Sequence, residues 1–182
     1  MPALLDVLVT GYADERVAST VVLVRDAGQV IVVDPGMVAD RRAILDPMER
    51  LGVAPASVTD VVLSHHHPDH TLNVALFPPV RVHDHMAIYE GDTWTDRDAE
   101  GYQVSPSVRL LATPGHTDQD VTTLVTTADG LVACTHLWWS QEGPELDPFA
   151  RDQTLLERSR RRVLDLAPVL IVPGHGAPWA PA

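Results

Sequence analysis

The sequence feature that most restricts the fold of this chain is a group of ligand-type residues directly after a strand-like segment. In 61-VVLSHHHPDHT-71, four histidines and an aspartate follow an apolar run within six residues. Three further histidines, His116, His136 and His175, each follow another apolar run. Side chains at strand ends are held rigidly by the sheet and stay within reach of solvent. We therefore expect a fold that gathers several strand ends into one site.

Strand-like and helix-like segments follow one another with no repeat and no linker rich in proline, glycine or serine. Apolar, β-branched runs predict strands, with a hairpin turn at Asp129-Gly130, over residues 19–26, 29–36, 58–66, 79–85, 107–116, 121–136 and 168–176. Helical spacing predicts helices over 39–52, with Pro47 inside, and 152–166. Residues 90–102 are expected to form a loop. This mixture predicts an α/β (α+β) protein of layered sheets flanked by helices, in one domain over residues 1–182.

Charge and hydropathy exclude several classes of partner. The formal net charge of -12 argues against nucleic acid as the main partner, because phosphate binding requires clustered lysine and arginine. The one basic cluster, 158-RSRRR-162, is expected to be a solvated helix face. No apolar run is long enough to span a bilayer, and no basic region precedes the short apolar stretch at the N-terminus. We therefore expect a cytoplasmic protein without a membrane partner.

The histidine cluster has the pattern of a metal site rather than of a thiol site. The single cysteine, Cys134, lies in an apolar run and is expected to be buried and inert. In an extended segment, alternation places His65 and His67 on one side, while Asp69 and His70 turn elsewhere and His66 points away. Neutral imidazole and carboxylate suit zinc, iron or manganese, so the cluster can serve two adjacent ions.

Four motifs together resemble the metallo-β-lactamase-fold hydrolases. They are 65-HHHPDH-70, the Asp34 of 33-VDPG-36, 113-TPGH-116 and 173-PGHG-176, in family order. The glycine before each of the last two histidines is expected to allow the backbone that turns the imidazole inward. A closer resemblance is to metallo-β-lactamase domain-containing protein 1 and its small bacterial relatives, carried by 75-ALFP-78, 112-ATPGHTDQDV-121, 157-ERSRRRVL-164 and 172-VPGHGAPW-179. The resemblance implies an αββα four-layer sandwich with the metals at one edge, between the sheets.

The same resemblance implies a role for each matched residue. One ion would be held by His65, His67 and His116, and a second by Asp69, His70 and His175. Asp34 would support the metal-binding loop without being a ligand itself. In the family pattern the hairpin strand ends in Gly-Asp, and that aspartate bridges the ions.

Here the corresponding pair is Thr135-His136. A neutral imidazole has one free lone pair and no charge, so it bridges two ions only as an imidazolate. We therefore predict a weakened second site, two separated ions or a single ion. The expected cofactor is one or two Zn²⁺ ions, with iron or manganese as alternatives, and His136 is a candidate ligand.

The leading functional hypothesis is hydrolysis of an ester, thioester, lactone, amide or phosphoester of a small molecule by a metal-bound hydroxide. Asp69 would orient the water and receive its proton, which makes it the candidate catalytic residue. Two alternatives stay open. Asp69, His70 and His175 could form the 2-His-1-carboxylate set of a mononuclear iron oxygenase or lyase. His136 could instead complete a closed four-histidine site in a metal-binding protein without turnover.

The sequence says less about substrate and assembly. Trp94, Trp138 and Trp139 are candidates for an aromatic pocket wall, and a core or rim position is an equal alternative. His83 and His85 are expected to lie near a strand end without being ligands. A homodimer is left open as the assembly.

Overall fold

The computed structural model describes residues 2–78 and 80–181, which form two large sheets and a small hairpin. The first sheet contains, in spatial order, β1 (Leu4–Val9), β4 (Val21–Asp26), β5 (Gln29–Val33), β6 (Asp60–Val62), β7 (Arg81–His83), β8 (Ala87–Glu90) and β9 (Thr93–Asp96). The second contains β10 (Gln103–Ser105), β11 (Val108–Ala112), β12 (Val121–Thr127), β13 (Gly130–Thr135) and β14 (Leu170–Pro173). The hairpin is β2 (Tyr12–Ala13) and β3 (Val17–Ala18).

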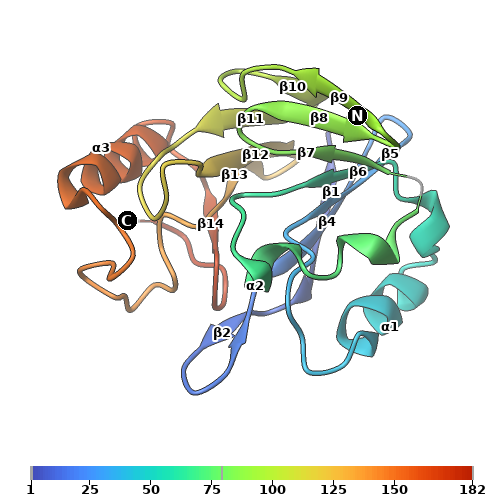
Figure 1. Ribbon diagram of the computed structural model, residues 1–182, viewed down its shortest axis with the longest axis horizontal. Coiled ribbons are helices and arrows are strands. Elements are labelled where there is room, and N and C mark those ends of the chain that lie inside the picture. Colours follow the sequence, from blue (N-terminus) through green and yellow to red (C-terminus); the bar gives the residue numbers. More distant parts are fainter. Residues whose placement is uncertain (1, 79, 182) are drawn as a thin grey trace.

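Five helical segments accompany the strands: α1 (Arg42–Arg50), α2 (Pro68–Thr71), α3 (Gln153–Leu164) and two 3₁₀ turns, Pro55–Ser57 and Val74–Leu76. The two longer helices, α1 and α3, lie on opposite sides of the pair of sheets (Figure 1). Asp152 caps α3 by accepting hydrogen bonds from the backbone N–H groups of Thr154 and Leu155. No helix in the described part of the chain is long and apolar enough to cross a membrane.

Period-2 alternation along the strands explains how the sheets stack. In β4, Val22 and Val24 face the core between the sheets, where they meet residues of β11 to β14 such as Leu110. Val21 and Leu23 face the other way, into a second core. Each sheet therefore has two buried faces, which requires a further layer on its outer side.

The two longer helices supply those outer layers. Ile44 and Met48 of α1 are fully buried in the second core, against the first sheet. Leu156 and Val163 of α3 are fully buried against the outer face of the second sheet. The order of layers is helix, sheet, sheet, helix, so the predicted αββα sandwich is confirmed.

Strand direction explains why the ligand-type residues meet. The pairs β5–β6, β6–β7 and β13–β14 are parallel, so their carboxyl ends lie at one edge of each sheet. The two edges are joined by a hydrogen bond from the Val121 N–H to the Ser64 carbonyl, 2.8 Å, and by another from the Thr20 N–H to the Gly174 carbonyl, 2.7 Å. The segments after β6, β11, β13 and β14 therefore open onto the same space.

Some local predictions were wrong. Residues 90–102 are not simply a loop, because Thr93–Asp96 form β9 at the edge of the first sheet. The strands β1, β2, β3, β8 and β10 were not predicted at all, because the last four are short and Asp6 interrupts the apolar run of β1. The basic cluster of α3 is not wholly a solvated face. Arg160 is 9% exposed and its Nε donates to the Leu137 carbonyl at 2.8 Å.

Candidate metal centre

Three histidines from two segments converge on one point. His65 follows β6, His67 lies directly before α2, and His116 follows β11. His67 Nδ1 lies 3.0 Å from His65 Nε2 and 3.1 Å from His116 Nε2. Ligands of a tetrahedral ion at about 2.0–2.1 Å are separated by about 3.3 Å. Two of the three separations are therefore close to those of ligands of one ion, and the ligand atoms of His65 and His116 lie within 4.8 Å of each other.

A second group lies beside the first. Asp69 and His70 belong to α2, and His175 follows β14. Asp69 Oδ2 lies 3.4 Å from His70 Nε2 and 3.5 Å from His175 Nε2. His70 is fully buried, and its Nε2 has no hydrogen-bond partner among the described residues. A buried polar atom without a partner is costly, so this nitrogen is one that a metal ion would satisfy.

The electrostatics of this second group favour a cation. Burial lowers the pKa of His70, but the carboxylates of Asp34 and Asp69 outweigh it and raise that pKa to about 9. Burial raises the pKa of Asp69, but the neighbouring His70 and, after it, His175 lower that pKa to about 2. The same negative field that holds a proton on His70 would attract a divalent ion in its place.

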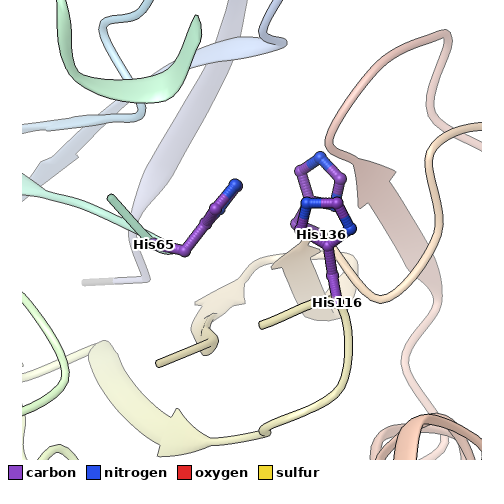
Figure 2. A group of neighbouring side chains, drawn as sticks. All are labelled: His65, His116 and His136. Carbon is purple, nitrogen blue, oxygen red and sulfur yellow. The ribbon is translucent and has the colours of Figure 1, made fainter. Parts of the chain in front are cut away.

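His136 lies between the two groups. Its ligand atom is within 4.8 Å of those of His65 and His116, and equally of those of His70 and His175. Figure 2 shows its ring beside that of His116, with His65 facing both from the other side. Its Nε2 lies 3.1 Å from His175 Nε2, and its buried Nδ1 has no partner among the described residues. Burial, and then the neighbouring histidines, hold the pKa of His136 well below its usual value, so the ring is neutral.

Four rings are oriented by a partner at the nitrogen that faces away from the centre. The Nδ1 contacts are His65 to Ser64 Oγ at 3.0 Å, His70 to Asp34 Oδ2 at 2.8 Å, His116 to Asp147 Oδ2 at 2.7 Å and His175 to the Ala18 carbonyl at 2.9 Å. A partner at Nδ1 sets the tautomer of a metal-binding imidazole and leaves Nε2 for the ion. All four rings therefore present Nε2 to the centre.

Asp34 connects two parts of this framework. One carboxylate oxygen contacts His70, and the other accepts a hydrogen bond from the Ser64 N–H at 2.7 Å. Its backbone has a φ of 51°, in the left-handed region where an aspartate is uncommon. Asp34 therefore links the backbone of the segment after β6 to the ring of His70.

The glycines before His116 and His175 have a more specific role than the one expected. Neither Gly115 nor Gly174 has a positive φ. A Cβ on Gly174 would lie 2.4 Å from Cδ2 of His136, and one on Gly115 would lie 2.7 Å from a methyl carbon of Leu156. Glycine is required here because of close packing against a neighbouring side chain.

The sequence did not reveal Asp147. This buried carboxylate lies in the segment between β13 and α3, where no motif marks it. Its Oδ2 accepts from Nδ1 of His116 at 2.7 Å and from Nε1 of Trp139 at 2.9 Å. Its Oδ1 accepts from the N–H of Phe149 at 2.9 Å. Asp147 therefore ties one candidate ligand to two aromatic residues.

A cavity of about 410 Å³ opens onto the centre. Its walls contain candidate ligands of both groups together with residues of the β2–β3 hairpin and of the Asp147 segment: Ala13, Asp14, Val17, His67, Pro68, Asp69, His116, His136, Trp139, Phe149 and His175. Trp139 is thus a wall residue. Trp138 packs against Trp179 with ring centroids 6.0 Å apart, and Trp94 is exposed beside Tyr89, so neither forms this wall.

The remaining histidines lie outside the centre. His66 is exposed and its Nε2 contacts Asp84 Oδ2 at 3.0 Å. His83 is buried and its Nε2 contacts Asp60 Oδ1 at 2.8 Å. His85 lies near His66, with ring centroids 5.5 Å apart. Cys134 is buried, and burial raises the pKa of its thiol to about 12, as expected for an inert cysteine.

Comparison with known proteins identifies one family. The model of the metallo-beta-lactamase superfamily matches residues 14–92. Metallo-beta-lactamase domain-containing protein 1 of Homo sapiens is 36% identical over 157 residues, which cover 82% of this chain and 59% of that protein. The Xenopus laevis protein of the same name is 31% identical, covering 82% of this chain and 67% of its own length. This chain thus spans about three fifths of the human relative.

Solved structures agree on the fold. A Thermotoga maritima protein provisionally named a metallo-beta-lactamase superimposes with a TM-score of 0.80 at 22% identity, and the match covers 100% of both chains.

Proposed function

The chain belongs to the metallo-beta-lactamase superfamily, and we propose that it is a metal-dependent hydrolase that cleaves an ester, thioester, lactone, amide or phosphoester bond of a small molecule. The observation that carries the proposal is the pair of ligand-atom groups that share the wall of one cavity. We propose one or two Zn²⁺ ions as the cofactor, with iron or manganese as alternatives.

The residues present fit such an ion. The ligand set is imidazole and carboxylate, which suits these metals. Nε2 of His70 and Nδ1 of His136 are buried without partners among the described residues, so bound metal would satisfy atoms that otherwise carry a desolvation cost. When bound, a divalent ion would supply a water of pKa lowered to about 7 and a positive charge for the substrate oxygen.

Asp69 is the proposed catalytic residue. Its carboxylate lies in the cavity wall beside His70 and His175 and is only partly buried. The low pKa of Asp69, about 2, keeps it ionised at neutral pH despite its burial. In this form it can orient a water molecule by accepting a hydrogen bond, and we propose it as the acceptor of that water's proton.

The walls away from the candidate ligands would bind the substrate. Trp139 and Phe149 stack with ring centroids 5.9 Å apart and, with Val17, form an apolar side of the cavity. Such a surface suits an apolar group attached to the scissile bond, while the ions hold the polar end.

His136 favours one alternative. Its nitrogen lies close enough to His65 and His116 to complete a four-histidine site with His67. Such a site would leave no open coordination position and would bind metal without turnover. The iron oxygenase or lyase alternative would use Asp69, His70 and His175.

The test is turnover of chromogenic esters, thioesters, lactones, β-lactams and phosphodiesters by protein of known metal content, with and without oxygen. We expect turnover that needs metal and not oxygen, and that Asp69→Asn abolishes. Asp92→Asn, an exposed residue of the β8–β9 turn that does not line this cavity, is the control and should retain activity. Turnover that requires oxygen, or equal activity after metal removal, would refute hydrolysis.

A further inference from the structure

A third group of ligand-type side chains lies outside the metal centre. It consists of His66, Asp84 and His85, whose ligand atoms all lie within 4.8 Å of one another. His66 Nε2 is 3.0 Å from Asp84 Oδ2, and His85 Nδ1 is 3.9 Å from the same oxygen. His66 comes from the turn after β6, whereas the other two residues form the connection between β7 and β8.

The carboxylate of Asp84 is fixed before any ion binds. It is 1% exposed, and its Oδ1 accepts hydrogen bonds from the backbone N–H groups of Met86 and Ala87, both at 2.8 Å. Its Oδ2 accepts one from the Tyr89 hydroxyl at 2.7 Å. Carboxylates that bind metals are commonly held by such outer hydrogen bonds.

The two imidazoles are placed to complete a ligand set. His85 Nδ1 is buried and has no hydrogen-bond partner within the described residues, although it faces Asp84. Tetrahedral ligands at about 2.0–2.2 Å are about 3.3–3.6 Å apart. The contact of His66 with Asp84 is already as short as this, and the His85 nitrogen needs to approach Asp84 by a few tenths of an ångström. The ligand atoms of His66 and His85 lie within 4.8 Å of each other. Both histidine side chains are partly exposed, 41% and 27%, so small rotations are open to them.

One neighbouring charge opposes a cation. Arg97 is close enough to Asp84 for their charges to interact. Its guanidinium lies over the Tyr102 ring, 4.6 Å from the centroid, and makes no hydrogen bond to any described residue. Arg97 therefore leaves both oxygens of Asp84 to their other partners, but its repulsion weakens cation binding. We expect this site to be weaker than the metal centre.

We propose that His66, Asp84 and His85 form a peripheral binding site for one divalent transition-metal ion, with Zn²⁺ as the probe. Two imidazoles and one carboxylate are a sufficient set for such an ion, with water completing the coordination. An ion bound there would restrain His66, which stands between His65 and His67 of the metal centre. The site is independent of the hydrolase proposal, because it uses none of the proposed catalytic residues.

The experiment is equilibrium dialysis of the full chain against increasing Zn²⁺ concentrations, with bound metal per chain measured at each step. We expect the amount of Zn²⁺ bound at saturation to be one ion per chain higher for the wild type than for His85→Gln or His66→Gln. The metal-centre ions, bound at lower Zn²⁺ concentrations, should remain in both variants. Glu90→Gln removes an exposed carboxylate at the end of the adjacent strand β8 and should match the wild type.

Equal plateaus for the wild type and both histidine variants would overturn the proposal and leave His66 and Asp84 as a simple hydrogen-bonded pair. A second readout uses the wild-type protein alone, so it stays informative if the histidine variants lose stability. Cu²⁺ added to wild-type protein whose metal centre is filled with Zn²⁺ should give an electron paramagnetic resonance signal with nitrogen coupling. Absence of that coupling in the wild type would also overturn the proposal.

Discussion

Replacing Asp147 by asparagine tests how the metal centre is supported. Asp147 Oδ2 accepts two hydrogen bonds, from His116 at 2.7 Å and Trp139 at 2.9 Å, while Oδ1 accepts one from Phe149. An asparagine has one oxygen and one NH₂ group. In either orientation of the amide, NH₂ faces at least one N–H group, so at least one donor is left without an acceptor.

The size of the effect follows from those contacts. A hydrogen bond to a charged acceptor contributes about 1.5–3 kcal/mol. Loss of a partner that orients a metal-binding histidine typically costs 10–100-fold in metal affinity or activity, which is about 1.4–2.7 kcal/mol. The two ranges overlap. We therefore expect Asp147→Asn to lower the affinity for the ion held by His65, His67 and His116 by about 10–100-fold.

The assay is competition for Zn²⁺ with a chromophoric chelator, which needs no substrate. Glu145→Gln removes the same charge from an exposed position on the same segment and should bind Zn²⁺ like the wild type. Equal Zn²⁺ affinity in Asp147→Asn and the wild type, with an unchanged melting temperature, would refute the proposed orienting role of Asp147.

Four further predictions concern the centre and the fold. His136→Asp should tighten binding of a second ion by adding a carboxylate between the two groups; metal-binding isotherms identical to those of the wild type would contradict this. Gly174→Ala should lower the bound metal per chain, because its Cβ would lie 2.4 Å from the His136 ring, and elemental analysis would show it. Chelation of the metal should lower the melting temperature and Zn²⁺ should restore it, because an ion bound only by the folded state stabilises that state; a melting temperature unchanged by chelation would contradict metal binding. Asp60→Ala should cost about 3–5 kcal/mol in urea unfolding, since it removes a fully buried carboxylate and leaves the buried His83 without its partner. Burial raises the pKa of Asp60, but hydrogen bonds from His83 and Thr59 outweigh it and lower that pKa to about 2, below the usual 3.8. The stabilisation is therefore complete above about pH 4 and is lost as the pH falls toward 2, a loss that Asp60→Ala should not show.

The local sequence was sufficient where a residue pattern has a single physical outcome. The valine-rich runs of β4 and β5 were correctly predicted as strands. The hairpin between β12 and β13 was predicted from Asp129-Gly130, but the turn lies one residue earlier, at Ala128 and Asp129, and Gly130 begins β13. The motifs around His65, His116 and His175 correctly predicted that these residues follow strands, whereas metal binding by them stays a prediction. The edge strand β9 was missed because four exposed residues carry no period-2 apolar signal.

By itself, the sequence determined that imidazoles and a carboxylate follow several strands of a layered α/β protein, because residue type and apolar periodicity are local properties. Residue chemistry alone did not say which of them meet: the two groups were predicted through the family resemblance, and only the tertiary structure brought their atoms together. The distances between His67 and His116, the contact of Asp147 with His116 and the position of His136 between the two groups all join residues far apart in the chain. Such contacts depend on how the two sheets stack and how their edges align, and no local pattern encodes that alignment.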